Sequence, residues 1–150
     1  MKFTALTTKA IRMWLKENDI ECGCRLGGVM SYDDNDNCIY VGRVYDNECD
    51  YDFIKCLRGL GLAVDFDCIT LSILHELGHW FTYNDFTDRQ IDIYANAVER
   101  ISNIEDSEKR NKKYWELRVE YVANVWAVEF ANEHKKEVQA LEDMIYETLA

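Results

Sequence analysis

Glycine and proline are distributed unevenly along this 150-residue chain. There is no proline, and all seven glycines lie at or before Gly78, so residues 80–150 contain neither of the two residue types that most disfavour helix interiors. The apolar residues of this second half also recur at helical spacing. The expected fold is therefore α+β, with a mostly helical C-terminal half and a small sheet of two or three strands.

Short elements are expected before Gly78. Asp and Asn residues at 33–37 favour a turn between two apolar segments, which predicts a β-hairpin within 24–46. Helical spacing and capping residues predict two helices here. The expected elements are a helix over 8–18 capped by Thr7 or Thr8, a short helix from Asp50 or Asp52 to Gly59 or Gly61, and a strand at 62–66.

Long amphipathic helices are expected after residue 67. One covers about 69–83, and a second begins at Thr87, where Thr87 and Gln90 resemble a capping box. A third is capped by Ser107 and continues through YWELRVEYVANVWAVEFA. A last segment buries Val138, Leu141, Met144, Ile145 and Leu149, and the pattern leaves open whether the chain bends between Asn132 and His134.

Composition limits the partners and the compartment. The chain has 17 Lys and Arg against 28 Asp and Glu, a formal charge of −11, which would repel nucleic acid and favour a basic or unstructured protein partner. No apolar run resembles a signal peptide or a membrane span, so we expect one cytoplasmic domain over 1–150 that does not enter a membrane. In that compartment the six cysteines should be free thiols, and Cys22-Gly23-Cys24 lacks the spacing of a zinc knuckle.

The sequence HELGH at 75–79 is the strongest chemical signal. In a helix, residues four apart project from the same face, so His75 and His79 can bind one zinc ion (Zn2+). Glu76 lies one step round the helix, where it can take a proton from a zinc-activated water as general base. Gly78 costs about 1 kcal/mol of helix propensity, which makes sense if another segment or a substrate approaches closely. The alternative is that these are two core histidines and a surface glutamate.

A catalytic zinc site normally has three protein ligands, so a further ligand is needed. Glu120 is favoured because the positions one and two turns along its face are Ala123, Asn124 and Ala127, which let its helix approach closely. Asn124 could add a supporting hydrogen bond. The other candidates are Glu116, Glu129, Glu133, His134, Asp85 and Asp88. Tyr83, Tyr114 and Tyr121 are candidates for stabilising charge on a substrate carbonyl, with none preferred.

The residues 62–131 resemble the ImmA/IrrE family of zincin-like metallopeptidases. In that family HELGH precedes a helix of pattern E-x-E-A-N-x-F-A, and here the segment from Glu120 reads EYVANVWA. The resemblance implies a zincin-like fold, Glu120 as the third zinc ligand, and a protein substrate such as a helix-turn-helix repressor. Val122 replaces the second acidic residue, and the long spacing from His79 to Glu120 implies an inserted helix at about 87–104.

Three functions are compatible with these features. The leading one is a zinc endopeptidase acting on a protein or peptide, with metal ligands His75, His79 and Glu120 and general base Glu76. A second is an interaction protein that keeps the zinc core for structure, although such a protein would not need Glu76. A third is a DNA-associated protease of the SprT type, which the negative charge disfavours.

Overall fold

The computed structural model describes residues 2–43 and 51–149, which form an α+β fold. Within these ranges the elements are seven α-helices, three strands and a 3-10 turn. The helices are α1 (Ala5–Glu17), α2 (Tyr51–Gly59), α3 (Cys68–Thr82), α4 (Asp88–Ser102), α5 (Ser107–Glu116), α6 (Arg118–Glu133) and α7 (Lys135–Thr148). The strands are β1 (Gly23–Gly27), β2 (Ser31–Asp33) and β3 (Cys38–Gly42), and the turn η1 covers Tyr83–Asp85. The predicted fold class is confirmed at this level.

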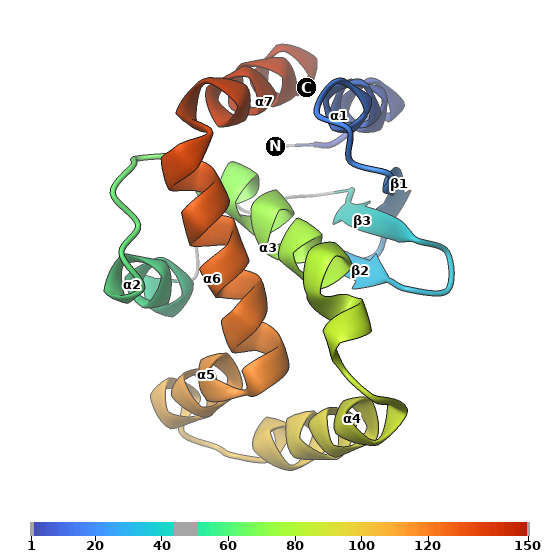
Figure 1. The fold of residues 1–150 in the computed structure, drawn as a ribbon. Helices are drawn as coiled ribbons and strands as arrows, with labels where there is room; N and C mark the ends of the chain where they lie inside the picture. Colours follow the sequence, from blue (N-terminus) through green and yellow to red (C-terminus); the bar gives the residue numbers. More distant parts are fainter. Residues whose placement is uncertain (1, 44–50, 150) are drawn as a thin grey trace.

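Helices α3 and α6 cross the centre of the molecule side by side (Figure 1). The sheet lies beside α3, α1 and α7 pack together at one end, and α4 and α5 lie at the other. Buried apolar residues of α3, α6, α1, α7 and β3 form the main core, which contains Trp14, Ile39, Ile73, Ala127 and Leu141. None of the described helices combines the length and apolar character needed to cross a membrane.

The sheet has the order β1-β3-β2. β2 and β3 pair antiparallel across a turn in which Asp33 Oδ1 accepts hydrogen bonds from the backbone N–H groups of Asn35 and Asp36, so a hairpin is confirmed. The predicted first strand of the hairpin, however, is interrupted from Gly28 to Met30. The residues before this interruption form β1, which pairs parallel to β3. Residues 44–46 of the predicted hairpin lie outside the described ranges.

The predicted strand at 62–66 is wrong. Its alternating pattern is real, because Leu62, Val64 and Phe66 are partly buried against the core while Ala63 and Asp65 are exposed. The backbone finds other partners: the N–H of Leu62 donates to the carbonyl of residue 57, and the N–H of Ala63 to Asn132 Oδ1. The segment is therefore an extended connection without a neighbouring strand.

Several helix boundaries differ from the predictions because side-chain caps decide them. α1 begins three residues early, since Thr4 and Thr7 form a capping box. The predicted capping box of Thr87 and Gln90 is confirmed at the start of α4. Helix α2 ends at Gly59 as expected. Asp50, one of the two residues predicted to start α2, lies outside the described ranges. Asp106, not Ser107, caps α5. The long third helix is two helices, because Leu117 is extended (φ −59°, ψ 132°), and a further break occurs at His134.

The expectation that the cysteines are free thiols is partly wrong. Cys22, Cys24, Cys38 and Cys56 are free, and burial raises the pKa of each thiol, as expected of thiols that do not bind metal. Cys68, at the start of α3, is disulfide-bonded. The sequence pattern contained no sign of this pairing, because disulfide geometry depends on distances between segments. Cys49 lies outside the described ranges.

Candidate metal centre

Helix α3 carries both histidines and is buried along most of its length. Its interior residues Ile73, Leu74 and Leu77 are completely buried, as expected of a helix at the centre of a domain. His75 is also buried, while the His79 side chain is 15% exposed and so faces the edge of the core. The apolar pattern is incomplete at the C-terminal end, where Phe81 is 59% exposed.

Glu120 reaches this site from the first turn of α6, which begins immediately after the break at Leu117. The small residues Ala123 and Ala127 follow on the same face and are buried against α3. The two backbones meet at Gly78, where a Cβ atom would lie 2.4 Å from the carbonyl oxygen of Ala123. Gly78 is therefore required because another helix approaches there, as the sequence suggested.

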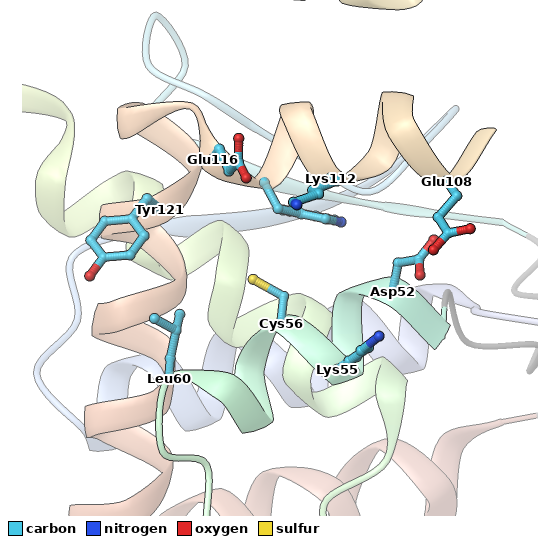
Figure 2. Close-up of a pocket in the computed structure, with 9 residues that line it drawn as sticks. Asp52, Lys55, Cys56, Leu60, Glu108, Lys112, Glu116 and Tyr121 are labelled. Atoms are coloured by element: carbon cyan, nitrogen blue, oxygen red, sulfur yellow. The ribbon is translucent and has the colours of Figure 1, made fainter. Parts of the chain in front are cut away.

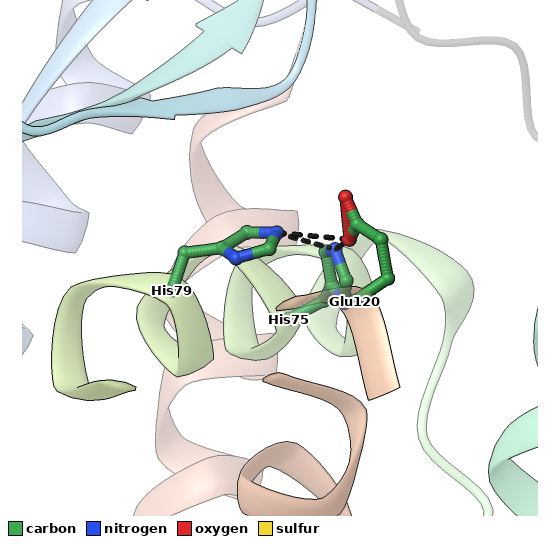
Figure 3. A group of neighbouring side chains, drawn as sticks. All are labelled: His75, His79 and Glu120. Carbon is green, nitrogen blue, oxygen red and sulfur yellow. Dashed lines mark hydrogen bonds and ion pairs between the residues drawn. The ribbon is translucent and has the colours of Figure 1, made fainter. Parts of the chain in front are cut away.

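Three atoms from these two helices converge (Figure 3). Glu120 Oε2 lies 3.1 Å from His75 Nε2 and 3.0 Å from His79 Nε2, and the two Nε2 atoms are 3.1 Å apart. Ligand atoms bound to one metal at about 2.0–2.1 Å are separated by about 2.9–3.4 Å, depending on the bond angle. The spacing of the three atoms is thus that of ligands sharing a cation.

The burial of Glu120 supports the same interpretation. The residue is 2% exposed, and its Oε2 has no hydrogen-bond partner among the described residues although it is completely buried. Burial opposes ionisation of this carboxyl, but the two imidazoles beside it outweigh burial and lower its pKa well below the usual range. A buried, ionised oxygen without a donor is costly unless a cation binds it.

Asn124 orients His75 through Nδ1, the ring nitrogen that does not face Glu120. Its Oδ1 lies 2.6 Å from His75 Nδ1, so the protonated Nδ1 donates to the amide and Nε2 keeps its lone pair for a metal. The rings of Phe53 and Trp115 pack edge-on against the imidazole at 5.7 and 5.5 Å between centroids. Burial lowers the pKa of His75, but the Glu120 carboxylate beside it outweighs burial, and the net shift is upward. The hydrogen bond predicted for Asn124 is therefore present.

Two tyrosines hold the second oxygen of Glu120. The hydroxyls of Tyr94 on α4 and Tyr114 on α5 donate to Oε1 at 2.7 and 2.6 Å. Oε1 is thereby occupied, which leaves Oε2 as the oxygen that faces the two imidazoles. Tyr114 was a candidate only for carbonyl stabilisation, and Tyr94 was missed, because its place in the apolar stripe of its helix resembles that of a packing residue.

Removing either hydroxyl should weaken metal binding. We expect Tyr94→Phe and Tyr114→Phe each to raise the dissociation constant for zinc about 10-fold, because groups that position ligands typically contribute 10- to 100-fold. Competition with a chromophoric chelator measures this constant directly. Tyr121→Phe is the matched control, since Tyr121 directly follows Glu120, is 46% exposed and is not among the hydroxyls that donate to Oε1. Equal affinities in all four proteins would contradict this role.

Glu76 lines a cavity of about 320 Å³ beside the three converging atoms. It is 9% exposed, and burial raises the pKa of its carboxyl, partly offset by the imidazoles and a backbone hydrogen bond from Tyr32. Glu76 is not one of the three converging residues. The cavity is lined by Met30, Ser31, Tyr32, Asp34, Glu76, His79, Tyr83, Ile91, Tyr94, Tyr114, Val119 and Glu120.

The other candidate ligands are not brought to this position. All of them are exposed and none belongs to the converging group: Glu116, Glu129, Glu133, His134, Asp85 and Asp88. His75, His79 and Glu120 form the only such group of His, Cys, Asp or Glu within residues 2–43 and 51–149. Of the tyrosines considered for carbonyl stabilisation, Tyr83 and Tyr114 line the cavity and Tyr121 does not.

A second cavity, of about 510 Å³, is lined by Cys56 (Figure 2). It is bounded by α2, α5 and α6, and the Cys56 thiol points into it between α2 and α5. Asn124 Nδ2 donates to Cys56 Sγ at 3.8 Å, so the amide that orients His75 is itself held from this side. Carboxylates and lysines both line this cavity, without a converging group.

No protein-family model, curated protein or solved structure matches this chain. What the arrangement can do chemically follows from its own geometry. Two imidazole nitrogens and one carboxylate oxygen can hold a divalent cation, and three protein ligands leave room for a water or substrate. A carboxylate that does not bind the cation, Glu76, lines the same cavity.

Proposed function

We propose that this chain is a zinc-dependent peptidase in which His75, His79 and Glu120 bind the metal and Glu76 is the general base. The observation that supports it best is the convergence of three ligand atoms at 3.0–3.1 Å, with Glu120 Oε2 buried and without a hydrogen-bond donor. Two histidines and a carboxylate also occur in iron(II) sites. The additional carboxylate of Glu76 in the cavity favours hydrolysis, which requires a base.

Each residue has a defined part in the proposed reaction. Zinc bound here would supply Lewis acidity, polarising a carbonyl and lowering the pKa of water. Glu76 accepts a proton at its carboxylate as water attacks the peptide carbonyl, and then donates that proton to the leaving amine. Asn124 keeps the His75 lone pair directed into the site. Tyr94 and Tyr114 fix the Glu120 carboxylate through Oε1.

The edge of the sheet supports a peptide as the substrate. Within residues 2–43 and 51–149, β2 is an edge strand that pairs with β3 and with no other strand, and its residues Ser31 and Tyr32 line the cavity. A backbone group of Tyr32 is hydrogen-bonded to Glu76, so this edge faces the proposed base. An extended peptide can lie along such an edge by adding a strand. The scissile bond would then lie beside Glu76.

The wider proposal includes the family and the setting. The HELGH helix and the EYVANVWA helix pack together through Gly78 and Ala123, in keeping with a zincin-like enzyme of the ImmA/IrrE type. We propose that it acts in the cytosol on a regulatory or repressor protein. The free thiols of Cys22, Cys24, Cys38 and Cys56 are in keeping with that compartment, whereas the disulfide of Cys68 is unusual for it. The charge of −11 weighs against action on nucleic acid.

Metal removal tests this function. Protein stripped with a chelator should not cleave an unfolded protein such as casein, and adding one equivalent of zinc per chain should restore cleavage, because the described residues offer one ligand group. Mass spectrometry under native conditions measures the stoichiometry, and gel analysis measures cleavage. His134→Ala should behave as wild type, since His134 is exposed and outside the group. Full cleavage by the stripped protein, or no zinc binding, would contradict the proposal.

A further inference from the structure

The lining of the 320 Å³ cavity has an unusual chemical composition. Three carboxylates line it, from Asp34, Glu76 and Glu120. Four tyrosine rings line it as well, from Tyr32, Tyr83, Tyr94 and Tyr114. No lysine or arginine is among its lining residues in the part of the chain that the structure describes. Carboxylates combined with aromatic rings, without a competing cation, are the features that bind a positively charged side chain.

Two of the three carboxylates already have roles in the proposed reaction, and Asp34 does not. Glu120 faces the imidazoles and Glu76 is the proposed base, whereas Asp34 is exposed at the turn after β2. Asp34 has no lysine, arginine or histidine within ion-pair distance among the described residues. Its negative charge is thus available to a ligand that enters the cavity.

Tyr83 and Tyr32 lie next to this carboxylate. Tyr83, in η1 directly after α3, is hydrogen-bonded to Asp34, and this bond raises the pKa of the phenol. The Tyr83 ring packs against the Tyr32 ring at 6.4 Å between centroids, with an interplanar angle of 63°. The hydrogen bond connects the end of the histidine helix to the hairpin and sets two aromatic rings beside the charge. A cation at Asp34 would therefore contact ring surface as well as carboxylate.

The cavity also contains independent signs of a ligand. Glu120 Oε2 is buried, lacks a hydrogen-bond partner and belongs to the lining. The free edge of β2, which can hold an extended peptide, leads from Ser31 through Tyr32 directly toward Asp34. A peptide on this edge would carry a side chain near the scissile bond to Asp34.

We propose that Asp34, with Tyr32 and Tyr83, is a specificity site that selects peptides with a lysine or arginine near the bond to be cleaved. This inference rests on the proposed peptidase function, which it extends by naming the substrate class. The overall charge of −11 would act in the same direction, attracting basic segments to the protein before the local contacts form.

Binding of a defined peptide set tests the inference separately from turnover. The probes are dye-labelled peptides of about ten neutral residues in which one position at a time is Lys, Gln or Glu. Fluorescence anisotropy measures their binding to the zinc-loaded Glu76→Gln protein, and mass spectrometry measures their cleavage by wild type. We expect Lys at one position or more to tighten binding about fivefold over Gln, with Glu weaker still, as one partly exposed ion pair plus ring contacts would give.

The control is a second aspartate of the same turn. Asp34→Asn should remove most of the Lys preference, whereas Asp36→Asn makes the same charge change outside the cavity, where Asp36 Oδ2 accepts from the Tyr40 hydroxyl. Equal binding of the three peptide classes, no binding of any, or equal effects of the two variants would overturn the inference. Selective binding without cleavage by wild type would support the specificity site and contradict the peptidase function.

Discussion

Glu76→Gln should lower the rate of peptide cleavage by at least about 100-fold while the protein still binds one zinc ion, because general base catalysis contributes about 10²–10⁴-fold. Glutamine has nearly the same shape as glutamate but cannot accept the proton. Glu76 is outside the converging group and Glu120 holds its place through Tyr94 and Tyr114, so the metal ligands should be undisturbed.

Two measurements on the same sample check this result. A continuous assay with a quenched fluorescent peptide gives kcat/KM, and chelator competition gives zinc affinity. Glu129→Gln is the matched control, because Glu129 is an exposed glutamate on α6 and should keep wild-type activity. Full activity of Glu76→Gln, in cleavage or in a biological assay, would refute the proteolytic mechanism and favour the alternative of an interaction protein with a structural metal.

Gly78→Ala should be among the most destabilising single substitutions in this chain. A Cβ atom at residue 78 would lie 2.4 Å from the Ala123 carbonyl oxygen, 2.8 Å from its Cα and 2.9 Å from its carbonyl carbon. These are backbone atoms of a packed helix, so α3 and α6 must separate. Overpacking of this kind costs about 1–3 kcal/mol or more, which exceeds the gain of about 1 kcal/mol in helix propensity.

The same displacement should weaken the metal site. Glu120 precedes Ala123 by one turn of α6, so moving that turn away from α3 withdraws Oε2 from both imidazoles. We expect a lower free energy of unfolding in the metal-free protein and a weaker zinc affinity. Urea unfolding with a chelator present measures the first, and chelator competition the second.

Gly59→Ala is the matched control for this prediction. Gly59 is also helical, at the end of α2, but a Cβ atom there would meet nothing within 4 Å. This substitution should leave the free energy of unfolding within about 1 kcal/mol of wild type. If Gly78→Ala were as stable as Gly59→Ala, the close approach of α3 and α6 would be wrong, and with it the position of Glu120.

The converging group of His75, His79 and Glu120 was accessible to sequence reasoning because it depends mainly on local periodicity. Four-residue spacing puts His75 and His79 on one face of a helix whatever the rest of the chain does. Small residues after Glu120 indicated a helix that could approach closely, and Gly78 indicated the matching place on α3. The structure brings all three side chains together and confirms the hydrogen bond from His75 to Asn124.

Other features escaped prediction where local signals were weak or ambiguous. Leu117 has no turn-forming side chain, yet the chain is extended there, and the break places Glu120 in a first helical turn. The segment 62–66 has the alternation of a strand but pairs with a side chain of α6 instead. The disulfide of Cys68 also depends on a pairing that no local pattern indicates.

The sequence by itself thus determined the α+β class, the helical second half and the helical placement of His75, His79 and Glu120, because helix periodicity, capping and glycine placement act over a few residues. Only the tertiary structure decided what surrounds these three side chains. Tyr94 and Tyr114 meet at Glu120 Oε1, and Tyr32, Asp34 and Tyr83 meet at the cavity, from segments far apart in the chain. These contacts result from the packing of whole helices and strands against one another, and a local sequence pattern carries no information about that packing.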